Sequence, residues 1–179
     1  MDIENLDSLF AKLDSLGSMA VKAIESGLKK GIKYTQDEAK ALCPVDTGDL
    51  RASIKTRVEV DGDRVAGIVA TNNDHAAFVE FGTGPVGRAN HAGISPEVTP
   101  AYRDGAWWIH EGPGPNEISR EVAEKYHFFY IDTPEGRFYK CNGQPAQPFL
   151  YPAVNATKGT VAKIVSEVAR EELLKAVDK

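Results

Sequence analysis

The chain has 179 residues, of which 42% are hydrophobic, and a net charge of −5. This length and composition suit one domain of ordinary size and exclude wholesale disorder. The acidic balance argues against broad binding to a nucleic-acid backbone, which needs a basic face. No apolar run approaches the roughly 20 residues that span a bilayer, and the first ten residues do not resemble a signal peptide. We therefore expect a soluble protein made in a cytoplasm, with Cys43 and Cys141 reduced.

The first third of the chain has the spacing of an amphipathic helix. Apolar residues recur at three- and four-residue steps: Ile3, Leu6, Phe10, Leu13, Leu16, Ala20, Ala23, Ile24 and Leu28, then Ile32, Ala39 and Leu42. Gly17, Gly27 and Gly31 lower the helix propensity, so two helices or one bent helix are both open. The residue before a proline leaves the helical region, so the helix should end near Cys43.

Two short alternating segments follow, at 53–60 and 64–71, around the turn sequence "DGD" at 61–63. This pattern predicts a β-hairpin. The next segment, "HAAFVEFGTGP" at 75–85, predicts a short helical turn or strand that a glycine-rich loop ends.

Residues 84–148 are dense in glycine, proline and asparagine and predict a long excursion from a compact body. Within it, 127–143 predicts two strands around a "TPEG" turn. Helical spacing returns from about Ala153 to Val177. The fold class is therefore α+β: a long N-terminal helix, an antiparallel β-sheet with an extended loop or β excursion, and a C-terminal helix. We expect a single domain over residues 1–179, with an arm at about 84–142.

Candidate catalytic chemistry is scarce. The common nucleophile, zinc-protease, phosphate-loop and dinucleotide motifs are all missing from the sequence. His75 and Glu80 lie close together in sequence without a third metal ligand, so we interpret them as polar residues at the surface or an interface. Cys43 has only a distant histidine as a base, so a small buried residue that closes the helix is the favoured interpretation. We expect no enzyme activity, no catalytic residue, no metal and no cofactor.

The stretch "CPVDTGDLRASI" at 43–54 has a structural interpretation at each position. Pro44 stops the first helix, Asp46 or Thr47 caps the next turn, and Asp49 suits the positive end of that turn's dipole. Gly48 allows a tight approach, and Leu50 with Ile54 anchors the turn to the core. The stretch predicts a junction between helix, turn and strand.

Three motifs in order, "PVDTGDLRASI", "HAAFVEFGTG" and "GQPAQPFLYPAV", resemble a family of tailed-bacteriophage proteins. It is the head–tail joining or tail-completion family of long, non-contractile-tailed phages, also described as neck or minor tail components. The matching motif residues, expected to be structural, are Pro44, Asp46, Thr47, Gly48, Leu50, Arg51 and Ser53; Glu80, Phe81, Gly82 and Thr83; and Gln147, Pro148, Phe149, Leu150, Pro152 and Ala153. The stretch from 84 to 104 does not align with the family pattern.

The resemblance implies a structural virion protein that forms a ring, typically of six copies, at the neck. Its expected partners are other copies of itself, the neighbouring neck or connector protein and the tail tube protein. DNA at most passes through the ring, and no membrane is involved. We expect four aromatic side chains in the excursion to form an interface: Trp107, Trp108, Phe128 and Phe129. The alternative is that they pack within their own chain.

Two other function classes stay open at this point. One is a DNA-binding module at the packaging exit, which would show a steep salt dependence of binding. The other, least favoured, is a hydrolase that uses Cys43 or the His75–Glu80 pair.

Overall fold

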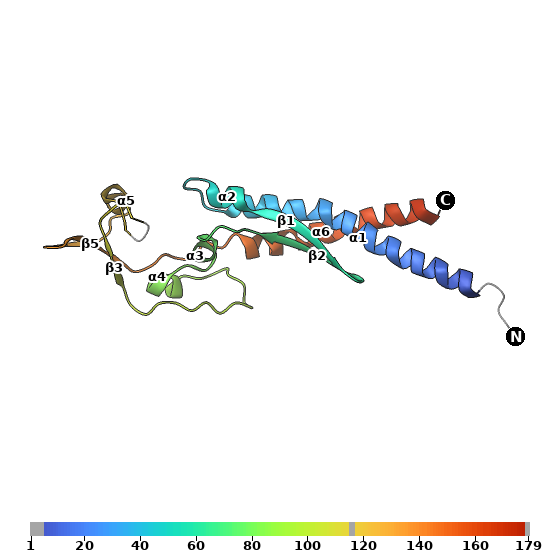
Figure 1. The fold of residues 1–179 in the computed structure, drawn as a ribbon, viewed down its shortest axis with the longest axis horizontal. Helices are drawn as coiled ribbons and strands as arrows, with labels where there is room; N and C mark the ends of the chain where they lie inside the picture. Colours follow the sequence, from blue (N-terminus) through green and yellow to red (C-terminus); the bar gives the residue numbers. More distant parts are fainter. Residues whose placement is uncertain (1–5, 115–116, 178–179) are drawn as a thin grey trace. The chain divides into compact units, whose positions relative to one another are not determined.

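The structure is a computed structural model that describes residues 6–114 and 117–177 (Figure 1). It confirms the α+β class, with a long helix at each end of the chain and two small antiparallel sheets between them. The chain divides into two compact units, Met1–Asp74 with Phe149–Lys179 (unit 1) and His75–Pro148 (unit 2). Whether they fold as a single domain, as the sequence predicts, stays a prediction.

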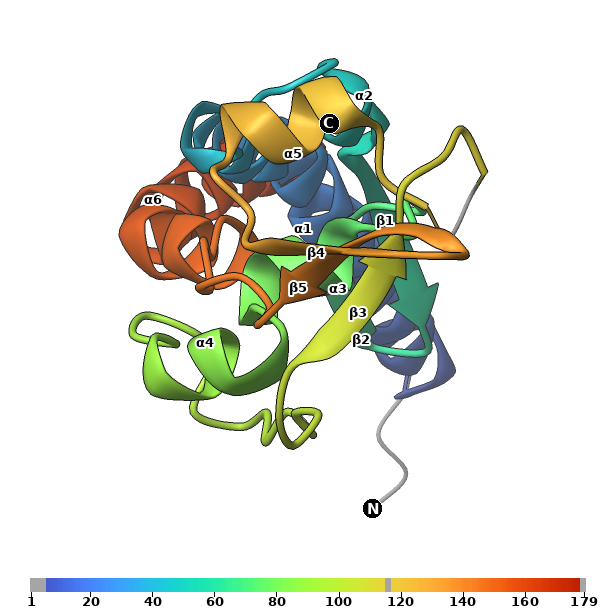
Figure 2. The same cartoon turned by 90° about the vertical axis from the view of Figure 1, so that its left-hand side faces the viewer.

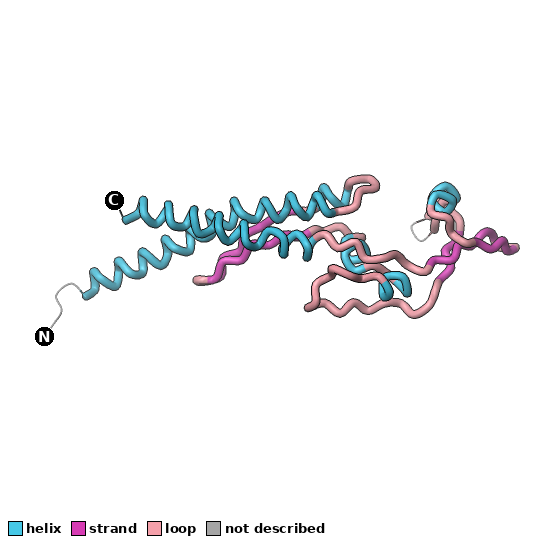
Figure 3. Tube along the Cα trace, turned by 180° about the vertical axis from the view of Figure 1, so that it is seen from behind, coloured by secondary structure: helices cyan, strands magenta, loops and turns pink. Residues whose placement is uncertain are grey.

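Unit 1 is built on two long helices, α1 (Leu6–Leu42) and α6 (Leu150–Val177), which lie side by side (Figures 1 and 3). α1 is one helix that ends just before Pro44, as predicted. Of its predicted apolar stripe, Ile3 lies outside the described residues, as do the side chains of Leu6, Phe10 and Leu13.

The contact between α1 and α6 depends on small residues at four-residue steps. The buried positions of this ridge are Ala23, Gly27, Gly31, Thr35, Ala39 and Cys43. A Cβ atom added to Gly27 would lie 2.8 Å from Val165 Cα, and one added to Gly31 would lie 3.1 Å from Val161 Cγ1. The glycines that lower the helix propensity of α1 therefore allow the two helix backbones to approach closely.

Two polar contacts fix the register of this helix pair. The Oγ1 atoms of Thr35 and Thr157 lie 2.7 Å apart, and Ser26 Oγ donates to Glu172 Oε1 at 2.7 Å. Both join positions more than 120 residues apart in sequence. A slip of either helix by one turn would break them.

The predicted hairpin is confirmed. After the short helix α2 (Asp49–Ser53), β1 (Lys55–Asp61) pairs antiparallel with β2 (Arg64–Ala70). Gly62 in the turn has φ 60°, a conformation that glycine adopts without strain. A Cβ atom on Gly67 would lie 2.8 Å from Ile32 Cδ1, so the hairpin packs closely on α1.

The C-terminal helix starts earlier than predicted. The sequence analysis places its start near Ala153, because of the prolines before it, whereas α6 begins at Leu150. Pro152 lies in the first turn, where its missing N–H would have no helical partner and costs nothing. Phe149 and Ala153 are fully buried, so the start of α6 is anchored in the core of unit 1.

Unit 2 contains a three-stranded antiparallel sheet in the order β3 (Trp107–His110), β5 (Gly136–Cys141), β4 (Tyr130–Thr133) (Figure 2). The two strands predicted around "TPEG" are confirmed as β4 and β5. The unit also contains the short helices α3 (Ala76–Phe81), α4 (Gly84–Ala89) and α5 (Arg120–Lys125). Neither α4 nor α5 is predicted from the sequence.

An extended segment at 144–147 is held against α3 and α4 by backbone bonds. Thr83 N donates to Gln144 O at 2.9 Å, Gln147 N to Val79 O at 2.8 Å, and Ala146 N to Asn90 O at 2.8 Å. A Cβ atom on Gly82 would lie 2.7 Å from Ala146 N. Glycine is therefore required where the two backbone segments meet.

Candidate assembly surfaces

The junction at 43–54 is structural, but its cap differs from the prediction. The N-cap of α2 is Gly48, with φ 92° and no side-chain cap bond, so neither Asp46 nor Thr47 occupies the N-cap position. Thr47 Oγ1 nevertheless accepts from Asp49 N, the first amide of α2, at 3.3 Å, as predicted for a capping oxygen, and donates to Asp49 Oδ2 at 2.8 Å. Nothing lies within 4 Å of a Cβ on Gly48, so glycine serves the left-handed backbone and not a tight approach.

Two further motif residues tie the junction together. Arg51 Nη2 donates to Cys43 O at 3.0 Å, at the end of α1. Ser53 Oγ donates to Leu50 O at 2.8 Å and lies 2.5 Å from Thr71 Oγ1, at the end of β2. Ile54 is fully buried, whereas Leu50 is only half-buried. These contacts join α1, α2 and β2.

The second and third motifs also lie at backbone junctions. Glu80 is buried, Phe81 O accepts from Tyr102 Oη at 2.9 Å, and Gly82 has φ 74°. Thr83 Oγ1 accepts from Gln144 N at 3.1 Å. The third motif runs from Gln147 and Pro148 in unit 2 into Phe149, Leu150, Pro152 and Ala153 at the start of α6. Their family role as structural residues stays a prediction.

One face of the unit 2 sheet carries exposed aromatic and apolar side chains. The register pairs Trp108 with Lys140 and His110 with Phe138 between β3 and β5, and Ile131 with Phe138 between β4 and β5. Opposite residues share a face, and the Trp108 and Phe129 rings lie 6.2 Å apart. We call this set the aromatic face: Trp108, His110, Phe129, Ile131, Phe138 and Lys140. Phe129 is 65% exposed and Trp108 45% exposed.

The four aromatics predicted at an interface fall into two pairs. Trp108 and Phe129 are exposed, whereas Trp107 and Phe128 are half-buried. The guanidinium of Arg103 lies 5.2 Å from the Trp107 ring centre, so this ring already has a partner. Ile131, which is not among the predicted interface residues, is also exposed and shares the aromatic face. Strand alternation around Phe129 could have identified it.

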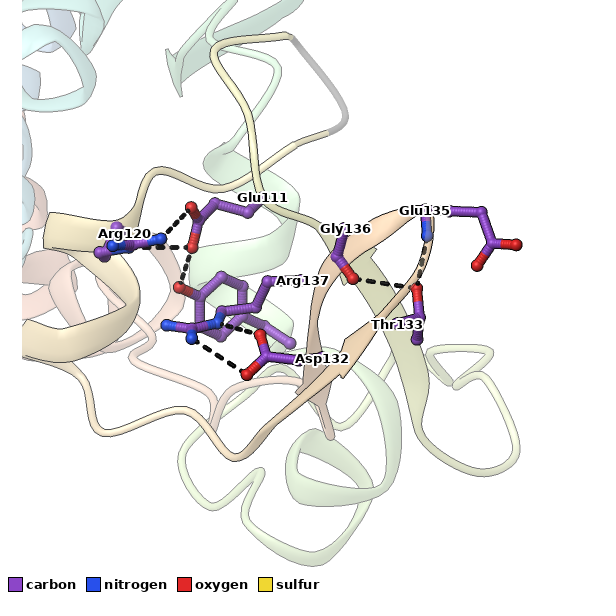
Figure 4. Close-up of polar contacts among 8 residues, drawn as sticks. Glu111, Arg120, Asp132, Thr133, Glu135, Gly136 and Arg137 are labelled. Atoms are coloured by element: carbon purple, nitrogen blue, oxygen red, sulfur yellow. Dashed lines mark hydrogen bonds and ion pairs between the residues drawn. The ribbon is translucent and has the colours of Figure 1, made fainter.

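The opposite face of the sheet is covered by polar contacts around Glu111 (Figure 4). Glu111 accepts from Arg120 Nη2 at 2.8 Å and from Tyr139 Oη at 2.5 Å. Arg137 Nε donates to Asp132 Oδ1 at 2.7 Å, and its guanidinium lies 4.0 Å from the Tyr130 ring centre. Because Arg120 belongs to α5, these bonds tie that helix to the strand that carries Tyr139.

The charges of this network shift its protonation equilibria. Hydrogen bonds from Arg120 and Tyr139 lower the pKa of Glu111 below its usual value of 4.5. The hydrogen bond from Arg137 lowers the pKa of Asp132 in the same way. Burial, and then the bond to Glu111, raises the pKa of Tyr139. At neutral pH the carboxylates are therefore charged and the tyrosine is protonated.

Unit 1 has an apolar groove of about 470 Å³ beside β2. β2 contributes Gly67 and Val69 to its lining, α1 contributes Leu28 and Ile32, and α6 contributes Val161 and Ala162, among others. We call it the β2 groove. It contains no acidic side chain, and Lys158 is its one charged lining residue. Such a surface suits apolar side chains from a partner better than a charged ligand.

Of the residues considered for catalysis, Cys43 directly follows α1 and Glu80 lies in α3. Cys43 is 1% exposed, with its Sγ 3.5 Å from Pro44 O. Within residues 6–114 and 117–177, no three histidine, cysteine or acidic side chains cluster to hold a metal ion. None of the described helices combines the length and apolar character needed to cross a membrane.

A family model described as "Bacteriophage HK97-gp10, putative tail-component" matches residues 7–82. This range covers most of the N-terminal part of unit 1 and the first two sequence motifs up to Gly82. No curated protein and no solved structure matches the chain. Over residues 7–82 the chain is thus similar to a family of phage tail components, which confirms the resemblance that the motifs predict.

Proposed function

We propose that this protein joins head and tail in a long-tailed phage, as a tail-completion component that assembles into a ring at the neck. The observation that carries the proposal is the match of residues 7–82 to the phage tail-component family, which supports a structural role in the tail. The more specific role, joining head and tail at the neck, is inferred from the resemblance of the three sequence motifs to the head–tail joining family. In this role the ring lies between the capsid connector and the tail tube, and DNA passes through its centre.

The exposed surfaces support an assembly role. A protein that works alone rarely exposes neighbouring large aromatics, because their contact with water is unfavourable. Trp108 and Phe129 nevertheless lie together on the aromatic face, and the β2 groove presents a second apolar surface. Neighbouring copies and the adjoining neck proteins are the natural cover for such surfaces. A structural part of the virion needs no catalytic site.

Removing the protein from an infection tests this role. Without it, host cells should accumulate DNA-filled heads and separate tails, and the wild-type gene supplied in trans should restore joined particles. Electron microscopy of the lysate measures the ratio of joined to separate particles. Infectious, fully joined particles in its absence would contradict the proposal.

A further inference from the structure

The first sheet has one edge protected by charge and one edge open. The exposed side chains of β1 are Lys55, Arg57, Glu59, Val60 and Asp61, and the four charged ones discourage pairing with another chain. β2 carries no charged residue after Arg64. Among the described residues, β1 is the only strand that pairs with β2. The free edge of β2 is therefore the place where this sheet can accept a further strand.

The second sheet also leaves one edge open. Beyond β3, Ile118 N donates to His110 O at 3.1 Å, so part of that edge is occupied. At the other side, the sheet ends with β4 in the described part of the chain. Phe129 just before β4 and Ile131 within it are 65% and 39% exposed. Each unit thus contributes one open strand edge.

The side chains of these two edges complement each other. The strand with the free edge, β2, also lines the β2 groove, together with Ile32 of α1 and Ala162 of α6. A strand added at this edge would place every second side chain over the groove. Phe129 and Ile131 have this spacing and share a face, whereas Tyr130 and Asp132 point to the other face, where Arg137 contacts both.

Building on the ring proposed above, we propose that β4 of one copy pairs with the free edge of β2 in a second copy. Phe129 and Ile131 then fill the β2 groove of that neighbour. The contact joins two different surfaces, so it can repeat from copy to copy, and it forms a ring when the rotation between neighbouring copies closes. Pairing of β2 with β2 would instead stop at a dimer. A second copy is the partner because this chain carries both halves of the contact.

Photocrosslinking locates the contact. Phe129 is replaced by p-benzoylphenylalanine, and equal amounts of ¹⁴N- and ¹⁵N-labelled full-length protein are mixed, assembled and irradiated. Mass spectrometry should find crosslinks from position 129 to residues 64–70 or 154–166 of a different copy. The same probe at Tyr126, which is 57% exposed at the end of α5, is the matched control and should give few of these crosslinks.

A charge placed in the groove tests its role in assembly. Ala162→Glu puts a carboxylate into the β2 groove, and Ala156→Glu puts the same side chain on an exposed position of α6 outside the groove lining. Lys158 lies one helical turn away in the groove lining, but burying a carboxylate removes it from water at a cost that one such pair does not offset, so Ala162→Glu should lower the association constant at least about tenfold. Ala156→Glu should change it by less than about twofold, in keeping with an exposed substitution outside the contact. Analytical ultracentrifugation over a concentration series measures both.

The outcomes separate this inference from the proposed function. A ring that forms normally with Ala162→Glu, or whose crosslinks from position 129 miss β2 and α6 of the neighbour, overturns the strand pairing and leaves the ring intact. If the parent protein forms no oligomer at any concentration and none in phage particles, the ring fails, and the pairing with it.

Discussion

The two units of this protein are stabilised by different kinds of interaction. In unit 1, the long helices approach closely because Gly27 and Gly31 of α1 leave room for valines of α6, and the core is apolar around Phe149 and Ile54. In unit 2, a short sheet is held by hydrogen bonds between charged groups around Glu111. The stability of unit 1 should therefore depend on side-chain volume, and that of unit 2 on protonation. Both tryptophans lie in unit 2, so their fluorescence reports on that unit alone.

The largest effect should come from the core of unit 1. Phe149 is fully buried, so Phe149→Ala should lower the free energy of unfolding by about 3–5 kcal/mol. Phe129→Ala removes the same side chain from a position that is 65% exposed, and should change it by less than about 0.5 kcal/mol. Thermal or urea melts followed by circular dichroism measure both. Equal effects from the two substitutions would mean that Phe149 is not a core residue.

The next effect tests the close approach of the helices. Gly27→Ala would place a Cβ 2.8 Å from Val165 Cα, so the helices must separate, at a cost of about 1–3 kcal/mol. Gly17→Ala is the control, because nothing lies within 4 Å of the added Cβ. There the gain in helix propensity should stabilise the protein by about 0.5–1 kcal/mol. Urea melts of both variants should therefore shift in opposite directions. Stabilisation by both would contradict the packing.

A smaller effect is expected at the junction. Gly48 has φ 92°, so Gly48→Ala should cost about 1–2 kcal/mol of backbone strain. Asp46 makes no cap bond to α2, and Asp46→Ala should leave the melting temperature nearly unchanged. Comparing the two variants distinguishes a requirement for the left-handed backbone at residue 48 from a capping role of the Asp46 side chain. A loss at Asp46 that matches the loss at Gly48 would restore the capping interpretation.

The mildest prediction concerns pH. The pKa of Glu111 is lowered in the folded protein, so the carboxylate stabilises unit 2 above its unfolded pKa near 4.5 and loses that contribution as the pH falls through the lower folded pKa. Below pH 4.5, tryptophan fluorescence should therefore report unfolding at a lower temperature than the helical circular dichroism signal does. Glu111→Gln should reduce this separation between the two signals. Parallel shifts of both signals with pH would contradict the contrast between the units.

Periodicity made most of unit 1 predictable. The spacing of apolar residues predicts α1 and its end at Pro44, and "DGD" predicts the hairpin. The same reasoning treated Gly27 and Gly31 only as weak points, because their purpose depends on Val165 and Val161 more than 120 residues away. Long-range contacts of this kind leave no signal in local spacing.

Unit 2 was harder to predict, for physical reasons. α4 and α5 have six residues each, too few for a helical period to appear. The network around Glu111 joins this residue, which directly follows β3, to residues of α5 and β5, and only the folded chain brings them together. The predicted interface aromatics were chosen by residue type, and the structure separates exposed Trp108 and Phe129 from half-buried Trp107 and Phe128. Their role at an interface stays a prediction.

Cryo-electron microscopy of intact phage particles at the neck tests the central claim most directly. We predict a closed ring of this chain, with six copies, between the capsid connector and the tail tube, and DNA or an open channel along its axis. Neck density that is fully explained by other proteins, or this chain found only elsewhere in the particle, would contradict the proposed role.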